Sequence, residues 1–77
     1  MRQALLGALL LWPAFAQDPK TAFDHGDYAA AIKLFEAANR RHPDCANALY
    51  IGLARHRLKR TGEALISFRS AVQCDPN

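Results

Sequence analysis

The side chains with the most evident chemistry in this 77-residue chain are its two cysteines and three histidines. A metal site would combine Cys45 with His42, at the spacing of i and i−3, and with Cys74 or His56. Zinc sites are usually built from repeated close pairs of ligands, which this chain lacks. It also lacks the Cys-x-x-Cys motif of thiol redox proteins. We therefore predict no metal site and no cofactor, and keep as the alternative function a small thiol- or metal-dependent factor that uses Cys45 and Cys74.

Two acid–imidazole neighbours, Asp24-His25 and His42 with Asp44, are the remaining residues with catalytic potential. Helical spacing brings no nucleophile to either of them. The chain contains no glycine-rich phosphate loop, no GxSxG motif and no HExxH motif. A chain of 77 residues forms at most one small domain, which excludes a doubly wound nucleotide-binding fold and most self-contained enzymes. We predict that the protein is not an enzyme.

The charge balance is mildly basic, with ten Lys and Arg residues, seven Asp and Glu residues and a net charge of +3. Basic residues gather at 55–60 and at 40–42, close to the predicted ends of helices, where cations complement the helix dipole. Aromatic residues of the kind that stack on single strands do not alternate with them. We predict no nucleic-acid partner, and we expect the isolated Glu36 and Glu63 to be solvated.

The segment 1–16 has the three parts of a secretory signal. Arg2 supplies a positive start, residues 4–12 are apolar except for one glycine, and Ala14-Phe15-Ala16 has the small-x-small form of a cleavage site. A membrane-spanning helix needs about 20 apolar residues, more than this stretch provides. We predict cleavage between Ala16 and Gln17, no stable membrane insertion afterwards, and a secreted or periplasmic location; an uncleaved, membrane-anchored form is the alternative.

The rest of the chain repeats itself with a period that is typical of helical solenoids. A single offset aligns Ala31 with Ala64, Phe35 with Phe68, Ala38 with Ala71 and Pro43 with Pro76. Within each copy the spacing places a small, a large and a small side chain on one stripe of a helix. Small residues let a neighbouring backbone approach closely, while the phenylalanine fills the remaining space.

Residues 26–77 resemble a tetratricopeptide (TPR) repeat protein. The resemblance is carried in the first copy by Gly26-Asp27-Tyr28, Ala31, Phe35, Ala38 and Pro43, and in the second by residues 51–76. In the second copy Lys59-Arg60-Thr61 replaces the first turn's Gly-Asp-Tyr. The resemblance implies an all-α solenoid of antiparallel helix pairs, about one and a half repeats here, because Pro13 and Pro19 interrupt the first copy's opening helix.

Start and stop signals predict three main helices, over residues 28–41, 45–58 and 62–74, with Asp27, Asp44 and Thr61 as their N-caps. Residues 1–16 are then the signal peptide, 17–25 a loose or short helical segment, and 26–77 the repeat domain. The side chains expected on the buried stripe of the first helix are Tyr28, Ala31, Ile32, Phe35 and Ala38, and those of the third are Ala64, Leu65, Phe68, Ala71 and Val72. The second helix carries Leu49, Ile51, Gly52, Leu53, Ala54 and Leu58.

The two cysteines lie at matching ends of the second and third predicted helices. Cys45 begins one helix and Cys74 ends the next, so in an antiparallel pair they are level. Cys45 shares a helix face with Ala48, and Cys74 shares one with Ala71, and these are the faces that meet. Export also favours pairing, because thiols outside the cytosol tend to be oxidised. We predict a Cys45–Cys74 disulfide; two buried free thiols are the alternative.

In TPR proteins the first helices of successive repeats line a concave groove that holds peptides. Carried over by resemblance, the partner-binding residues here are Ala46, Leu49, Tyr50, Leu53, His56 and Arg57. They would form an apolar floor with a basic rim for a peptide or a partner protein. The alternative is that Leu49 and Leu53 belong to the core or cover for a missing neighbouring repeat. Open repeat ends also allow self-association.

Overall fold

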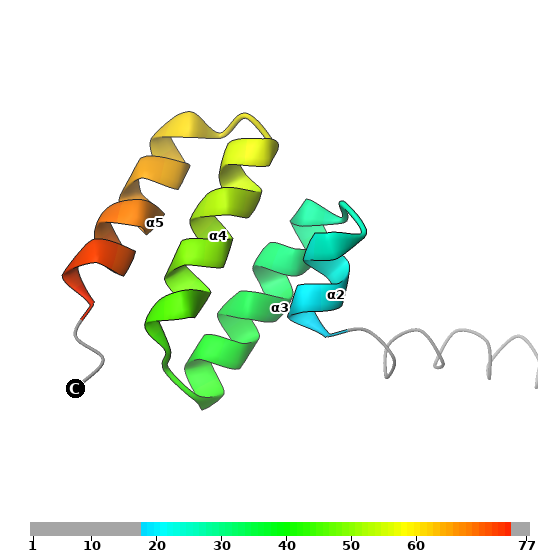
Figure 1. The fold of residues 1–77 in the computed structure, drawn as a ribbon, viewed down its shortest axis with the longest axis horizontal. Coiled ribbons are helices and arrows are strands. Elements are labelled where there is room, and N and C mark those ends of the chain that lie inside the picture. Colours follow the sequence, from blue (N-terminus) through cyan, green and yellow to red (C-terminus); the bar gives the residue numbers. More distant parts are fainter. Residues whose placement is uncertain (1–17, 75–77) are drawn as a thin grey trace, which may run out of the picture.

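The computed structural model describes residues 18–74, which form four α-helices and contain no strand. These are α2 (Pro19–Asp24), α3 (Tyr28–Arg41), α4 (Cys45–Arg57) and α5 (Thr61–Gln73). Each helix packs against the next one along the chain, and α5 forms one edge of the array (Figure 1). The predicted all-α fold and the three main helices are confirmed, while the predicted signal peptide lies outside the described residues. Between residues 18 and 74, no helix is long and apolar enough to cross a membrane.

Helix α2 occupies the segment for which the sequence predicts a loose or short helical structure. Pro19 does not break this helix but begins it, at a position where the missing N–H of proline costs no hydrogen bond. The Asp18 carboxylate accepts a hydrogen bond of 2.8 Å from the backbone N–H of Thr21, and this bond lowers the pKa of Asp18. Lys20 donates to Asp24 at 3.1 Å, which raises the pKa of Lys20.

The turns between the paired helices share one backbone conformation in both copies. Gly26 has φ +81°, and Lys59, its equivalent in the second copy, has φ +64°. The left-handed region favours glycine, so the second turn places a lysine where L-residues are strained. This shared conformation explains how Lys59-Arg60-Thr61 can replace Gly26-Asp27-Tyr28 without changing the connection.

Of the three predicted N-caps, only Asp44 has its expected role. Its carboxylate accepts from the backbone N–H of Ala46 at 2.9 Å. Asp27 occupies the predicted N-cap position of α3, but its side chain makes no cap hydrogen bond. The prediction for Thr61 was wrong, because Thr61 is already the first residue of α5 and Arg60 precedes it. Both helices follow a residue in the left-handed region, so the preceding turn fixes their start.

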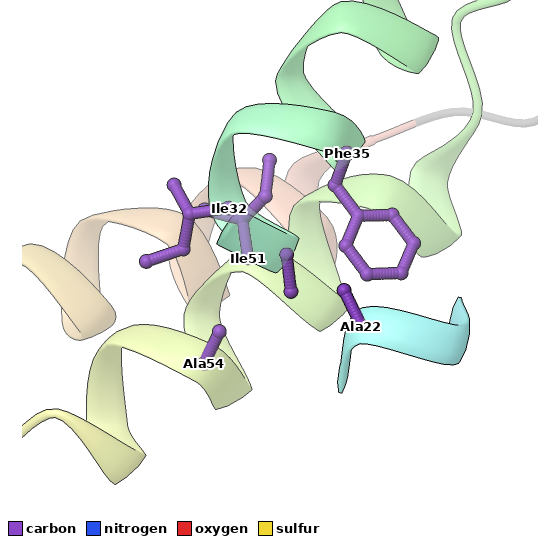
Figure 2. Close-up of a cluster of buried hydrophobic side chains, with 6 residues drawn as sticks. Ala22, Ile32, Phe35, Ile51 and Ala54 are labelled. Atoms are coloured by element: carbon purple, nitrogen blue, oxygen red, sulfur yellow. The ribbon is translucent and has the colours of Figure 1, made fainter. Parts of the chain in front are cut away.

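The hydrophobic core lies between α2, α3 and α4 (Figure 2). Ile32 and Phe35 of α3 are each 6% exposed, and they meet Ile51 and Ala54 of α4. Ala22 of α2 is fully buried in the same cluster, together with Ala31. Because Ala22 packs in this core, the short helix α2 is part of the folded domain.

Helices α4 and α5 are in closer contact than α3 and α4. The residues of α5 that are buried in this contact are small. Gly52 lies so close to Phe68 that a Cβ atom there would come within 2.7 Å of the ring. Ala64 and Ser67 are the buried residues of α5. The prediction that Leu65 and Val72 face inward was wrong: they are 58% and 84% exposed, because no helix of residues 18–74 packs on this flank of α5.

Candidate partner-binding face

The six residues predicted to bind a partner all lie on α4, but the structure divides them by exposure. Leu49 is 44% exposed, and Ala46, His56 and Arg57 are also exposed. Leu53 and Tyr50 are half-buried. The face therefore presents one exposed leucine with a second leucine one turn further on, and charged or polar side chains follow toward the end of the helix.

Tyr50 is anchored in an aromatic cluster rather than free to contact a partner. Its ring stacks on Phe35, with centroids 4.9 Å apart and an interplanar angle of 1°. Phe23 of α2 meets it edge to face at 5.4 Å, and Phe23 also meets Tyr28 at 5.4 Å. Such aromatic contacts fix ring positions as well as burying area. Tyr50 thus packs beneath the predicted face, and its contacts with Phe23 and Phe35 connect α4 to α2 and α3.

Arg57 is held in place by Tyr28 of α3. Its guanidinium lies 5.9 Å from the ring centroid of Tyr28, within cation–π distance, and Nη1 donates to the phenolic oxygen at 3.4 Å. The side chain remains exposed. This position leaves a positive charge beside His56 at the end of α4.

An arginine that the sequence analysis placed only in a basic cluster connects three helices. Arg55 Nη1 donates to Ser67 Oγ on α5 at 2.6 Å, and Nη2 donates to Glu36 on α3 at 3.5 Å. Its Nε lies 3.8 Å from a carboxylate oxygen of Glu63. Glu36 and Glu63 are therefore ion-pair partners of Arg55, and their side chains are also solvated, as expected, at 43% and 59% exposure. The internal repeat, which predicts that α4 packs between α3 and α5, is the only signal in the sequence that could have suggested these contacts of Arg55.

Cys45 and Cys74 are joined by a disulfide in the structure, with their Cα atoms 5.6 Å apart. The bridge connects the start of α4 to the residue that follows α5. It lines a hollow of about 470 Å³ whose walls include Asn39 and Ser70. Among residues 18–74, no group of three or more His, Cys, Asp or Glu side chains could hold a metal ion. Both thiols of the alternative thiol- or metal-dependent factor are thus used in the bridge.

Helices α2 to α5 are antiparallel and each packs against the next one along the chain. This arrangement is typical of helical-repeat proteins. A family model described as tetratricopeptide repeat matches residues 20–77, which is more than half of the chain. The chain therefore belongs to the tetratricopeptide repeat family, as its pattern of residues predicted, and the match also includes α2. No curated protein and no solved structure matches it. Membership of this family supports a general role as a protein–protein interaction module.

Proposed function

We propose that this protein is an exported, non-catalytic interaction module that presents the α4 face to a peptide or partner protein. The α4 face consists of Ala46, Leu49, Leu53, His56 and Arg57, supported by Tyr50. The observation that carries the proposal is the combination of an exposed Leu49 with a rigid support, because Tyr50 beneath the face is stacked on the core. A preformed apolar surface loses little conformational entropy when it binds.

The electrostatics of the face favour a particular kind of partner. His56 and Arg57 lie in the last turn of α4, where basic side chains complement the C-terminal end of the helix dipole. Tyr28 orients the Arg57 guanidinium. A peptide that places one apolar side chain against Leu49 and Leu53 and an acidic group near Arg57 would satisfy both features. Family members are typically non-catalytic, and the proposal requires no reaction.

The α4 face is tested by replacing Leu49 with arginine, which inserts a charge into the apolar floor. We expect Leu49→Arg to lose the partners that the unchanged protein captures from its own cells by cross-linking, a decrease of at least about tenfold. Lys33→Glu, on the exposed surface of α3, is the matched control and should capture the same partners. If Leu49→Arg is folded by circular dichroism and still captures them, the face has been assigned to the wrong residues.

Export is tested separately by the N-terminus of the protein recovered from cells that make it. Mass spectrometry should find a chain that begins at Gln17, because the small residues Ala14 and Ala16 fit a signal peptidase. The mature protein should appear outside the cytosolic fraction. A chain that begins at Met1 and remains with the cytosol or the membrane would contradict export, but it would not affect the assignment of the α4 face.

A further inference from the structure

The outer face of α5, formed by Leu65, Ile66, Arg69 and Val72, is the most apolar exposed surface of the described residues. Leu65 is 58%, Ile66 63% and Val72 84% exposed. Helical periodicity places these residues on a stripe of α5 beside the one formed by Ala64 and Phe68, which faces α4. Since α5 lies at the edge of the array, nothing in residues 18–74 covers this face (Figure 1).

The internal repeat indicates what would cover it. Leu65 is the equivalent of Ile32 in the first copy, which is only 6% exposed. Ile32 is covered by Ile51 and Ala54 of the helix that follows it, α4 (Figure 2). A helix that packs on α5 as α4 packs on α3 would therefore bring an apolar residue and, three positions later, an alanine or another small residue to Leu65.

The charge at the same junction is reversed between the two copies. In the first copy Glu36 of α3 accepts a hydrogen bond from Arg55 of α4, with 3.5 Å between the atoms. The residue equivalent to Glu36 in the second copy is Arg69. A helix docked on α5 would place its equivalent of Arg55, directly after the small residue, near Arg69. Charge complementarity then requires aspartate or glutamate at that position.

The opposite edge of the array does not fit α5, which argues against head-to-tail stacking of this chain. By the offset that relates the two copies, the α2 segment carries Asp18, Thr21 and His25 where α4 carries Ile51, Ala54 and Leu58. A second copy would bring these polar side chains, including the charged Asp18, to Leu65 and Ile66, and removing charged or polar groups from water to place them against apolar ones is unfavourable. The side of α4 that packs on α3 is already occupied, so α4 of a second copy is not available to dock on α5 either.

We propose that the outer face of α5 binds an amphipathic helix of a partner protein that carries an apolar residue, a small residue three positions later and an acidic residue directly after it. The apolar pair covers Leu65, and the acidic side chain pairs with Arg69. This interaction goes beyond the proposed function, because it uses a different helix of this protein and requires a partner segment that is itself helical.

The probe is a synthetic peptide with the sequence of residues 44–58, in which Cys45→Ala prevents disulfide exchange and Arg55→Glu supplies the acid. The matched control peptide keeps Arg55. We expect the glutamate peptide to bind the full, oxidised chain about fivefold more tightly than the control, with NMR shift changes on α5, since an exposed charge pair changes affinity by a small factor. In an Arg69→Glu chain the preference should reverse.

Leu65→Asp provides the apolar half of the test and should weaken binding of the glutamate peptide by at least about tenfold. The proposal is overturned if millimolar peptide moves no α5 signals, if the shifts lie on α3 and α4 because the peptide displaces α4, or if Arg69→Glu leaves the preference unchanged. It is also overturned if the chain alone dimerises through α5 and Leu65→Asp abolishes the dimer. None of these outcomes bears on the Leu49→Arg test.

Discussion

Replacing both cysteines, in a Cys45→Ala, Cys74→Ala chain, is expected to lower the free energy of unfolding by about 3–4 kcal/mol. The bridge joins residues 29 positions apart, and in the chain-entropy model a loop of this size restricts the unfolded state by about that amount. A small domain has a total stability of about 0.05–0.15 kcal/mol per residue, so this loss consumes much of it. The variant should be largely unfolded at temperatures where the parent chain is folded.

Urea unfolding followed by circular dichroism measures this effect. The oxidised parent chain should show a clear transition, and adding a thiol reductant should shift the midpoint toward that of the double variant. The double variant, which has no bridge to reduce, should not respond to reductant. A parent chain that unfolds identically with and without reductant, or whose intact mass does not fall by two daltons on oxidation, would contradict a stabilising disulfide.

The position of the bridge indicates where its loss acts first. Beyond Phe68, Ala71 is half-buried and the other residues of α5 to Gln73 are exposed. The early part of α5 is held by Ser67, which accepts from Arg55. The disulfide therefore ties down the half of α5 that packing holds least, and reduction should loosen this end before the core opens.

The sequence predicted the fold because its signals were local and repeated. Pro43 stops α3, Asp44 starts α4, and the internal repeat pairs Phe35 with Phe68 regardless of tertiary detail. The same reasoning misjudged Pro19, because a proline that disrupts the interior of a helix is well accommodated at its first residue. The sequence shows that a proline is present at position 19, but whether that proline breaks a helix depends on where the helix begins.

The remaining errors concern what surrounds each helix, which one sequence does not reveal. A buried stripe predicts burial only where a neighbouring helix exists, so Leu65 and Val72 satisfy the pattern and yet are exposed. Arg55 looked like one member of a basic cluster, because its partners lie on two other helices, 19 residues before it and 12 residues after it. The α4 face was likewise only partly predictable, because Tyr50 is half-buried and stacks on Phe35 of α3. The sequence does not show this contact between two helices.

Substituting alanine for each of two helical glycines should have effects of opposite sign. A Cβ atom at Gly52 would lie 2.7 Å from two carbons of the Phe68 ring and 3.2 Å from Ser67 Cβ, so α5 must move or Phe68 must leave its position. Overpacking of this kind costs about 1–3 kcal/mol. A Cβ atom at Gly62 would have no neighbour within 4 Å, so Gly62→Ala should gain helix propensity, up to about 1 kcal/mol.

The gain in helix propensity is larger for Gly52, inside α4, than for Gly62 in the first turn of α5, so propensity alone would make Gly52→Ala the more stable variant. A lower stability of Gly52→Ala therefore reports the contact with Phe68. Gly52→Ala should be about 1–3 kcal/mol less stable than Gly62→Ala in urea titrations of the oxidised chains. Phe68→Leu, which removes Cε1, one of the two ring carbons nearest to the new methyl group, should recover part of the loss in Gly52→Ala but destabilise the parent chain. Equal stabilities for the two alanine variants would mean that α5 adjusts freely, and the close α4–α5 contact would then not hold the second helix pair together.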